Sequence, residues 1–336
     1  YWTFDRIMHQ DNDYLTMFFY PFVALYDESG WHNDEYTFFG ESYFNELGDY
    51  YVSINVPKDY QIATSGMALN TTELDNRKRV DYYLGNARDF SFSASPNYVN
   101  YHQQIDDISV DIYSLGGLEP EEQTQMFQII EDSFSVFEDY LGPYDQTHFT
   151  VEFGHFYGME STGIVYCSRE LSEGTVVHEI LHQWLYSMIG SDQSNESFVD
   201  ESLTTFLSVL YFYEIYGNEG RDEYLAFRDS RQERLEAHYL ITEGTHMIRQ
   251  VNQYGEEYAY IIYYHGPTLL RVFVETYLNN NYDTLKTILN GYYDMYYGDE
   301  VSLDEFLNYL EMSSGIEGTK EWFLQQFEGI KIPITN

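Results

Sequence analysis

The sequence predicts an α+β protein in which a β-rich N-terminal domain precedes a mixed, mainly helical domain. Three observations support this prediction. Alternating apolar and polar residues occur over the first hundred or so positions, a helical apolar period begins near Pro120, and after Gly174 the chain is mostly helical to about Gln326. We therefore expect a β-rich domain over residues 1–104 and a second domain over residues 105–336.

Short segments with period-2 alternation predict the strands. The segment that begins at Asp49 ends at Pro57, which cannot donate a ladder hydrogen bond. The predicted strands cover residues 49–56, 89–95, 109–113 and 148–153. Gly116 and Gly117 predict a turn after the third of these strands.

A helical apolar period follows that turn. The apolar residues that recur at helical spacing are Phe127, Ile130, Phe134, Phe137 and Leu141. They predict a helix from about Pro120 to Leu141, which Gly142 and Pro143 would end.

The charge balance is strongly acidic, with 56 Asp and Glu residues against 16 Lys and Arg residues and a formal net charge of −40. A surface of this sign repels phosphate, so we expect no nucleic-acid partner and no binding to an anionic membrane surface. Two interpretations of the charge remain open, namely a salt-adapted or secreted surface and a general solubility bias. Only five of the basic residues are Lys, which slightly favours the salt-adapted interpretation.

Composition excludes several structural features and types of site. No run of about 18 apolar residues occurs, so we expect no membrane-spanning helix. The chain does not begin with Met, so we expect a mature, extracellular or cell-surface form from which a leader or anchor has been removed. The single cysteine, Cys167, excludes a disulfide framework and a cysteine-based metal site, and its apolar neighbours predict a buried structural thiol.

The clearest chemical signal is the sequence His-Glu-Ile-Leu-His at residues 178–182. Positions i and i+4 of a helix lie on one face, so His178 and His182 can bind one ion. The flanking residues are almost all apolar, which predicts a buried helix, and a zinc ion would stabilise the ionisable groups buried there. Glu179 is placed to act as general base toward the attacking water. Chance produces this five-residue pattern in roughly one such chain in fifty.

A catalytic zinc site needs three protein ligands and an open fourth position. Eighteen residues separate His182 from Glu201, which opens a second predicted helix. The alternative interpretation of Glu201 is an acid in a first helical turn, where the helix dipole favours it. We predict one zinc ion per chain, bound by His178, His182 and Glu201.

Four short motifs occur in a fixed order along the chain. They read Tyr-Gly-Met-Glu-Ser at residues 157–161, His-Glu-Ile-Leu-His-Gln-Trp at 178–184, Val-Asp-Glu at 199–201 and Tyr-Tyr-His-Gly at 263–266. Together they resemble the aminopeptidase N family of zinc metallopeptidases, which are gluzincins, in a short bacterial-type form. The resemblance covers almost the whole chain. It implies a reduced N-terminal β domain followed by a thermolysin-like mixed and helical catalytic domain.

The resemblance also implies a role for each motif. Glu160 would bind the free α-amine of a peptide, with Gly158 and Met159 as neighbouring substrate-binding residues. From the residues alone, a solvated loop acid is the better interpretation of Glu160. Tyr263 would donate a hydrogen bond to the oxyanion formed during cleavage. Pro267 fits the first turn of a helix, so we expect Tyr263 on a turn just before that helix.

The chain departs from the family pattern at four positions. Ser161 stands where Asn is usual, Ser202 where Gly is usual, Ser208 where Glu is common, and His265 where Lys or Arg is usual. These changes can alter contacts to the first peptide carbonyl and the support of a zinc-bound histidine.

The sequence therefore predicts a zinc aminopeptidase that acts on peptides with a free N-terminus. The first alternative is a zinc endopeptidase on the same scaffold. The second is a zinc-bearing binding protein that has lost activity, against which Glu179 and Tyr263 argue. The sequence does not indicate the preferred first residue, the physiological substrate or the oligomeric state.

The charge predicts that salt stabilises the fold, because screening relieves repulsion between like charges. We expect the melting temperature to rise when the NaCl concentration is increased from about 0.01 M to about 1 M. Over this range the Debye length falls from about 30 Å to about 3 Å. Equal concentrations of sucrose are the control, since sucrose leaves the charges unscreened. A NaCl curve that is flat, or no steeper than the sucrose curve, would favour the solubility bias.

Overall fold

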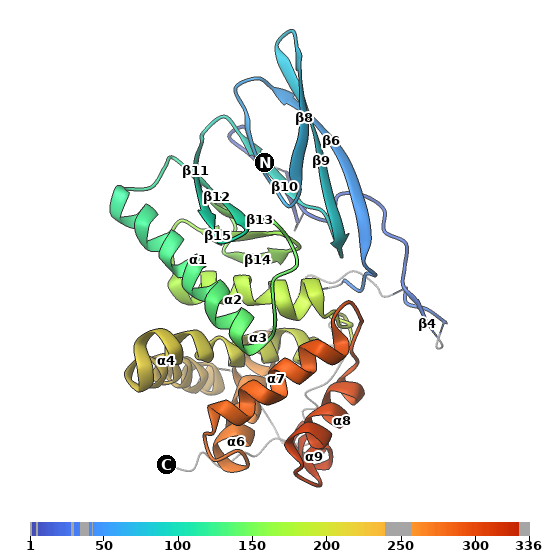
Figure 1. Ribbon diagram of the computed structural model, residues 1–336, viewed down its shortest axis with the longest axis vertical. Helices are drawn as coiled ribbons and strands as arrows, with labels where there is room; N and C mark the ends of the chain where they lie inside the picture. Colours follow the sequence, from blue (N-terminus) through green and yellow to red (C-terminus); the bar gives the residue numbers. More distant parts are fainter. Residues whose placement is uncertain are drawn as a thin grey trace. The chain divides into compact units, whose positions relative to one another are not determined.

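A computed structural model describes residues 2–4, 6–27, 30–33, 40–41, 43–238 and 257–328. The chain divides into two compact units. Unit 1 comprises residues 1–25, 45–135 and 144–188, and unit 2 comprises residues 26–44, 136–143 and 189–336. Most strands belong to unit 1 and most helices to unit 2 (Figure 1), which confirms the predicted α+β class. The domain boundary predicted at residues 104/105 falls at the end of a strand and stays a prediction.

The described residues of unit 1 form three β-sheets. Their strands are β1 (Trp2–Phe4), β2 (Ile7–Gln10), β3 (Asp13–Thr16), β6 (Gly48–Pro57), β7 (Gln61–Thr64), β8 (Met67–Leu74), β9 (Arg77–Ala87), β10 (Phe92–Ser95), β11 (Tyr98–Ile105), β12 (Ile108–Leu115), β13 (His148–Gly154), β14 (Gly158–Ser161) and β15 (Ile164–Ser168). The sheet orders are β1-β2-β3-β10-β7, β6-β9-β8 and β11-β12-β13-β15-β14. In the third sheet β12, β13 and β15 run parallel, and β11 and β14 are antiparallel edge strands.

The predicted strands occur with small shifts in their ends. Three of them correspond to β6, β12 and β13. β12 alternates buried and part-buried residues along its length, whereas β13 lies between two parallel neighbours and is buried almost throughout. The strand predicted from Asp89 begins only at Phe92, so that prediction is wrong at its N-terminal end. Asp89 is buried and accepts hydrogen bonds, which makes this stretch a polar loop.

Two α-helices and a π-helical segment complete unit 1. They are α1 (Pro120–Tyr140), whose last turn is counted with unit 2, α2 (Glu173–His182) and η1 (Gln183–Met188). Gly116 and Gly117, with φ of 77° and 81°, form the predicted turn before α1. The ring of Phe134 on α1 lies 5.2 Å from that of Phe149 on β13 and 5.7 Å from that of Trp184 on η1. These aromatic contacts join α1, the third sheet and the end of α2 in one core.

Unit 2 is mainly helical. Its helices are η2 (Phe198–Ser202), α3 (Leu203–Leu207), α4 (Val209–His238), α5 (Tyr258–Tyr260), η4 (Ile261–His265), α6 (Gly266–Thr276), α7 (Tyr282–Tyr296), α8 (Leu303–Ser314) and α9 (Thr319–Glu328), and a hairpin is formed by β4 (Tyr26–Asp27) and β5 (Gly30–Trp31). A glycine with φ of 69° and ψ of −159°, Gly217, kinks α4. A capping box of Ser302 and Glu305 begins α8, and Gly315 ends it. The helical content predicted after Gly174 is confirmed for the described residues.

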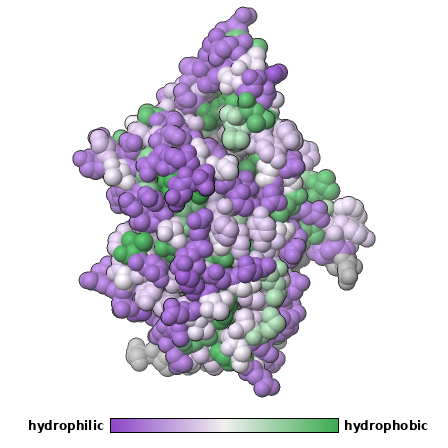
Figure 2. Space-filling view, viewed as in Figure 1, coloured by the Kyte–Doolittle hydropathy of each residue, from purple (hydrophilic) through white to green (hydrophobic). Residues whose placement is uncertain are grey.

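The surface follows the acidic composition. Figure 2 shows a face that is mostly hydrophilic, with its hydrophobic residues in small groups. Within residues 6–27, 43–238 and 257–328 and the shorter described segments, no helix is both long and apolar enough to cross a membrane.

A buried carboxyl lies in the middle of the third sheet. Glu152 on β13 is 1% exposed, and the Tyr98 hydroxyl donates a hydrogen bond to it. Burial raises the pKa of Glu152 to about 8, against the lowering effect of that hydrogen bond. Sequence reasoning missed this residue, because an acid in an alternating strand is typical of the solvent-facing side.

The raised pKa of Glu152 makes the stability of unit 1 depend on pH. The folded state holds a proton that the unfolded state has released, so the free energy of unfolding should fall as the pH rises from about 4.5 to about 8. Glu152→Gln mimics the protonated side chain, so its free energy of unfolding should fall less over that interval. Urea unfolding at several pH values measures both slopes, with the exposed Glu170→Gln as control. Parallel curves for wild type and Glu152→Gln would contradict the prediction.

Candidate metal centre and active site

Two histidine side chains meet on one face of α2. The Nε2 atoms of His178 and His182 lie 3.2 Å apart, and their ring planes are inclined by 84°. His182 is fully buried and His178 is part-buried. Zn–N bonds measure about 2.0–2.1 Å, so two nitrogens on one tetrahedral zinc are separated by about 3.3 Å. The geometry and the chemistry of these two donors therefore fit zinc.

The C-terminal end of α2 is tied to the turn between β14 and β15. Gln183 follows His182, and its Oε1 accepts a hydrogen bond from the Gly163 N–H at 2.8 Å. Its Nε2 donates to the carbonyl of Ser161 at 3.1 Å. The chain then changes direction in η1, at Leu185, with φ of −98° and ψ of 17°. These contacts fix where α2 ends, and with it the position of His182.

β14 passes close to α2 at the predicted general base. A Cβ built on Gly158 would lie 2.4 Å from Oε1 of Glu179, so only glycine fits at this approach. Side chains alternate along a strand, so Glu160 projects from the same face of β14 as Gly158, and Met159 from the other. Glu160 is 3% exposed and lies in β14, so it is not a solvated loop acid. Met159 is also buried.

Ser161, the first departure from the family pattern, makes a hydrogen bond that supports the fold. Its hydroxyl donates to the carboxylate of Asp89, which also accepts from the Thr162 N–H at 2.8 Å and the Ser91 hydroxyl at 3.2 Å. Burial raises the pKa of Asp89, and these donors oppose that shift. Sequence reasoning missed Asp89, because two of its donors, Ser161 and Thr162, lie more than seventy residues away along the chain.

Cys167 on β15 is 1% exposed, as the sequence predicts. Burial, followed by the nearby carboxylates of Glu179 and Glu152, raises the pKa of the Cys167 thiol well above its usual value. A thiol held in the protonated form is a poor nucleophile. Cys167 is therefore a packing residue.

Unit 2 holds the other two predicted residues and brings them together. Glu201 lies in η2 and is 3% exposed, and the hydroxyl of Tyr263 in η4 donates to its Oε1 at 2.6 Å. Burial, and then the Glu201 carboxylate, raise the pKa of Tyr263 well above its usual value. A second buried acid that sequence reasoning missed, Glu41, contributes to the same shift.

The expected turn before α6 is not present. Tyr263 lies in a π-helical segment that continues directly into α6, where Pro267 occupies the first turn. Because η4 precedes α6 without a break, the missing N–H of Pro267 leaves a carbonyl of η4 without its backbone donor, and another group has to supply one.

Three π-helical segments carry or border the predicted residues. η1 begins immediately after His182, η2 contains Glu201, and η4 contains Tyr263. A π-helical turn inserts a residue and changes the direction of the side chains, and such turns are frequent at functional sites. The 3.6-residue apolar period does not reveal them, so the sequence predicted ordinary helices here.

The residues at the other three departures also make contacts that support the fold. The Ser202 hydroxyl donates to the carbonyl of Ile262 at 2.6 Å, and the Ser208 hydroxyl donates to that of Thr204 at 2.9 Å. His265 is buried, with its ring stacked 6.1 Å from that of a tyrosine on α5.

Comparison with solved structures shows a shared fold. A two-domain M1 zinc metallopeptidase mutant bound to L-arginine superposes with a TM-score of 0.68 at 16% identity, over 86% of this chain and 66% of that chain. An M1 zinc metallopeptidase mutant from Deinococcus radiodurans bound to a Tyr-Ser-Ala substrate gives the same values. The M1 zinc metallopeptidase from Deinococcus radiodurans gives 0.67 at 16% identity, over 86% and 65%. The chain thus spans slightly less than two thirds of these proteins.

The family assignment comes from a domain model. No curated protein matches the chain. The model of the peptidase family M1 domain matches residues 118–327, which is more than half of the chain and contains all four motifs. The chain therefore belongs to peptidase family M1.

Proposed function

We propose that the chain is a zinc-dependent aminopeptidase whose metal is bound by His178, His182 and Glu201. The observation that carries the proposal is the 3.2 Å separation of the two histidine Nε2 atoms, which matches two ligands on one tetrahedral zinc. Membership of family M1 and the order of the motifs support Glu201 as the third ligand. An N–H···N hydrogen bond would give a similar separation, and metal analysis distinguishes the two. Zinc, when bound, supplies Lewis acidity toward a water and a peptide carbonyl.

The chain's own side chains supply the remaining chemistry. Glu179 takes the proton of the attacking water and later delivers it to the leaving amine. Tyr263 donates a hydrogen bond to the oxyanion as charge develops on the carbonyl oxygen. Gly158 leaves the space that the Glu179 carboxylate occupies.

Glu160 is the basis of the exopeptidase proposal. Its carboxylate projects from the face of β14 that approaches Glu179, and it would pair with a protonated α-amine. A fixed amine places the first peptide bond at the general base, so cleavage follows the first residue. The similar solved proteins bind L-arginine and a Tyr-Ser-Ala substrate, both of which have a free α-amine, and this supports the proposal. The extracellular or cell-surface location stays a prediction.

The zinc proposal predicts about one zinc per chain by elemental analysis, and His182→Ala should lose it.

Glu179→Gln should keep zinc and the melting temperature but lose about 10²- to 10⁴-fold in kcat, because the amide cannot accept the proton. His102→Ala, at an exposed histidine of unit 1, is the matched control and should keep both zinc and activity. Unchanged peptidase activity after complete removal of zinc would contradict the zinc proposal.

The aminopeptidase proposal predicts that N-acetylated peptides are poor substrates. Loss of a charge-assisted contact worth about 1.5–3 kcal/mol should lower kcat/KM roughly 10- to 100-fold, and Glu160→Ala should lose most of the preference for a free amine. The exposed Glu170→Ala is the control. Mass spectrometry of the products should show residues released one at a time from the N-terminus. Internal cuts in acetylated peptides at comparable rates would point instead to an endopeptidase.

A further inference from the structure

Side-chain donors hold the segment that carries Tyr263. Three consecutive carbonyls of η4 each accept a hydrogen bond from a side chain. The pairs are the Ser202 hydroxyl with Ile262 at 2.6 Å, the Arg228 guanidinium with Tyr263, and the Thr268 hydroxyl with Tyr264 at 2.9 Å. Ser202 and Arg228 lie outside this helix and Thr268 lies in α6, which continues it, so the η4 backbone is fixed from outside the helix as well as from within.

Pro267 and the π-helical turn together explain why carbonyls of η4 need external donors. In a π-helical segment each N–H donates to the carbonyl five residues earlier, as that of Gly266 does to Ile261, and proline has no N–H. The carbonyl five residues before Pro267 is that of Ile262, and the carbonyl four residues before it, at the spacing of an α-helix, is that of Tyr263. Pro267 can donate to neither, whereas Ser202 donates to the first and Arg228 to the second, and a charged donor makes a stronger hydrogen bond than a backbone amide.

Arg228 is itself held in place. Its guanidinium carbon lies 4.4 Å from the centroid of the Tyr264 ring, which is a cation–π distance. One planar group thus binds the backbone of Tyr263 and the side chain of the next residue. A lysine can provide the charge but not the planar stack.

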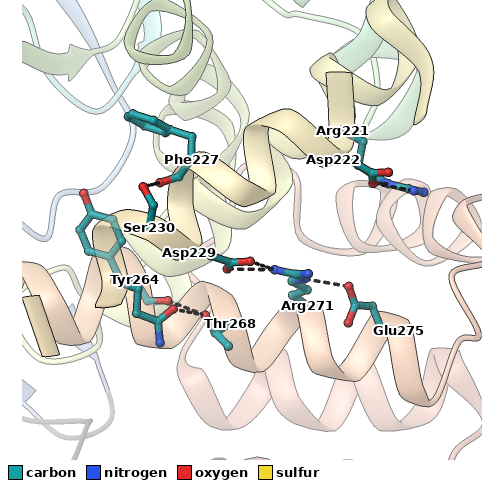
Figure 3. A network of polar contacts seen from close by, with 10 residues as sticks. Arg221, Asp222, Phe227, Asp229, Ser230, Tyr264, Thr268, Arg271 and Glu275 are labelled. Atoms are coloured by element: carbon teal, nitrogen blue, oxygen red, sulfur yellow. Dashed lines mark hydrogen bonds and ion pairs between the residues drawn. The ribbon is translucent and has the colours of Figure 1, made fainter. Parts of the chain in front are cut away.

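The part of α4 that carries Arg228 lies beyond the kink at Gly217 and meets α6 through polar contacts. Asp229 accepts two hydrogen bonds from the Arg271 guanidinium, both of 3.0 Å, and the side-chain amide of Gln232 lies within hydrogen-bond distance of the Thr268 hydroxyl oxygen, at 2.9 Å. Figure 3 shows the contact between Asp229 and Arg271, with Glu275 on the other side of the arginine. These contacts hold this part of α4 against α6, so Arg228 has a defined position relative to η4 and α6.

The space beside Arg228 is too small for a ligand. The cavity lined by Thr205, Arg228 and Thr268 has a volume of about 20 Å³, which holds about one water molecule. Arg271, which also lines it, is neutralised by Asp229 and Glu275. The cluster therefore does not form an anion site, and the backbone of Tyr263 is the group on which Arg228 acts.

We propose that Arg228 is a positioning residue for Tyr263. It holds the η4 backbone in the conformation that directs the Tyr263 hydroxyl to its present partner, 2.6 Å away on Glu201. The proposal rests on the function proposed above, in which that hydroxyl serves the oxyanion. Such a donor must lie within about 2.7–3.1 Å of the developing charge, and a misplacement of about 1 Å can cost about 10²-fold in rate.

Arg228→Met tests the proposal, because it keeps most of the side-chain length and removes the donor and the charge. We expect kcat to fall about 10- to 100-fold while KM stays within about threefold, since the lost contact matters only in the transition state. Arg228→Lys should lose less, because it keeps the charge and a donor. Arg231→Met is the matched control, at an exposed arginine on the same helix, and should leave kcat unchanged.

A double-mutant cycle separates positioning from a general structural role. If Arg228 acts through the Tyr263 hydroxyl, Arg228→Met should lower kcat little or not at all in a Tyr263→Phe background. A loss of kcat that is fully additive would overturn the inference. If Tyr263→Phe alone keeps full activity, the proposed role of Tyr263 fails instead, so the two failures are distinguishable.

Hydrogen exchange gives a readout that does not depend on activity. The η4 amides should exchange faster in Arg228→Met than in wild type and unchanged in Arg231→Met, with zinc content and melting temperature measured in parallel. If Arg228→Met does not fold, Arg228→Leu, which also lacks the donor and the charge, provides the same comparison. Unchanged exchange in a folded variant of either kind would also overturn the inference.

Discussion

The structure depends on hydrogen-bond donors for buried carboxylates. The chain has 56 acidic residues and only 16 Lys and Arg residues, and several of its buried acids accept hydrogen bonds from hydroxyl groups. The tyrosine pairs are Tyr98 with Glu152 and Tyr263 with Glu201. A phenol packs its ring in the core and donates one hydrogen bond without adding charge, which suits an acidic chain with 36 tyrosines.

The sequence predicts the site residues better than their local geometry. His178 and His182 were predictable because the i, i+4 spacing alone places two side chains on one helix face. The conformation around Tyr263 was not, because it depends on a π-helical segment and on donors from distant positions such as Arg228. Asp89 shows the same limit, since an alternating pattern predicted a strand where hydrogen bonds from Ser161 and Thr162 produce a buried polar loop.

Two of the departures from the family pattern are explained by neighbouring glycine or acid residues. Ser202 donates to the carbonyl before Tyr263, and a Cβ built on Gly266 would lie 2.2 Å from its hydroxyl oxygen. A serine at 202 is therefore compatible only with a glycine at 266. Ser161 in turn has Asp89 as its acceptor. Both serines support the backbone that carries a proposed functional residue, so neither indicates that the activity has been lost.

Salt screening acts differently on the contacts of two arginines, Arg271 and Arg228. Exposed ion pairs such as that of Arg271 with Asp229 weaken as ionic strength rises. The contact of Arg228 is different, because its acceptors are a carbonyl and an aromatic ring in a part-buried position. Salt screens such a contact much less. At high ionic strength we therefore expect the ion pair between α4 and α6 to weaken more than the hydrogen bond that holds the Tyr263 backbone.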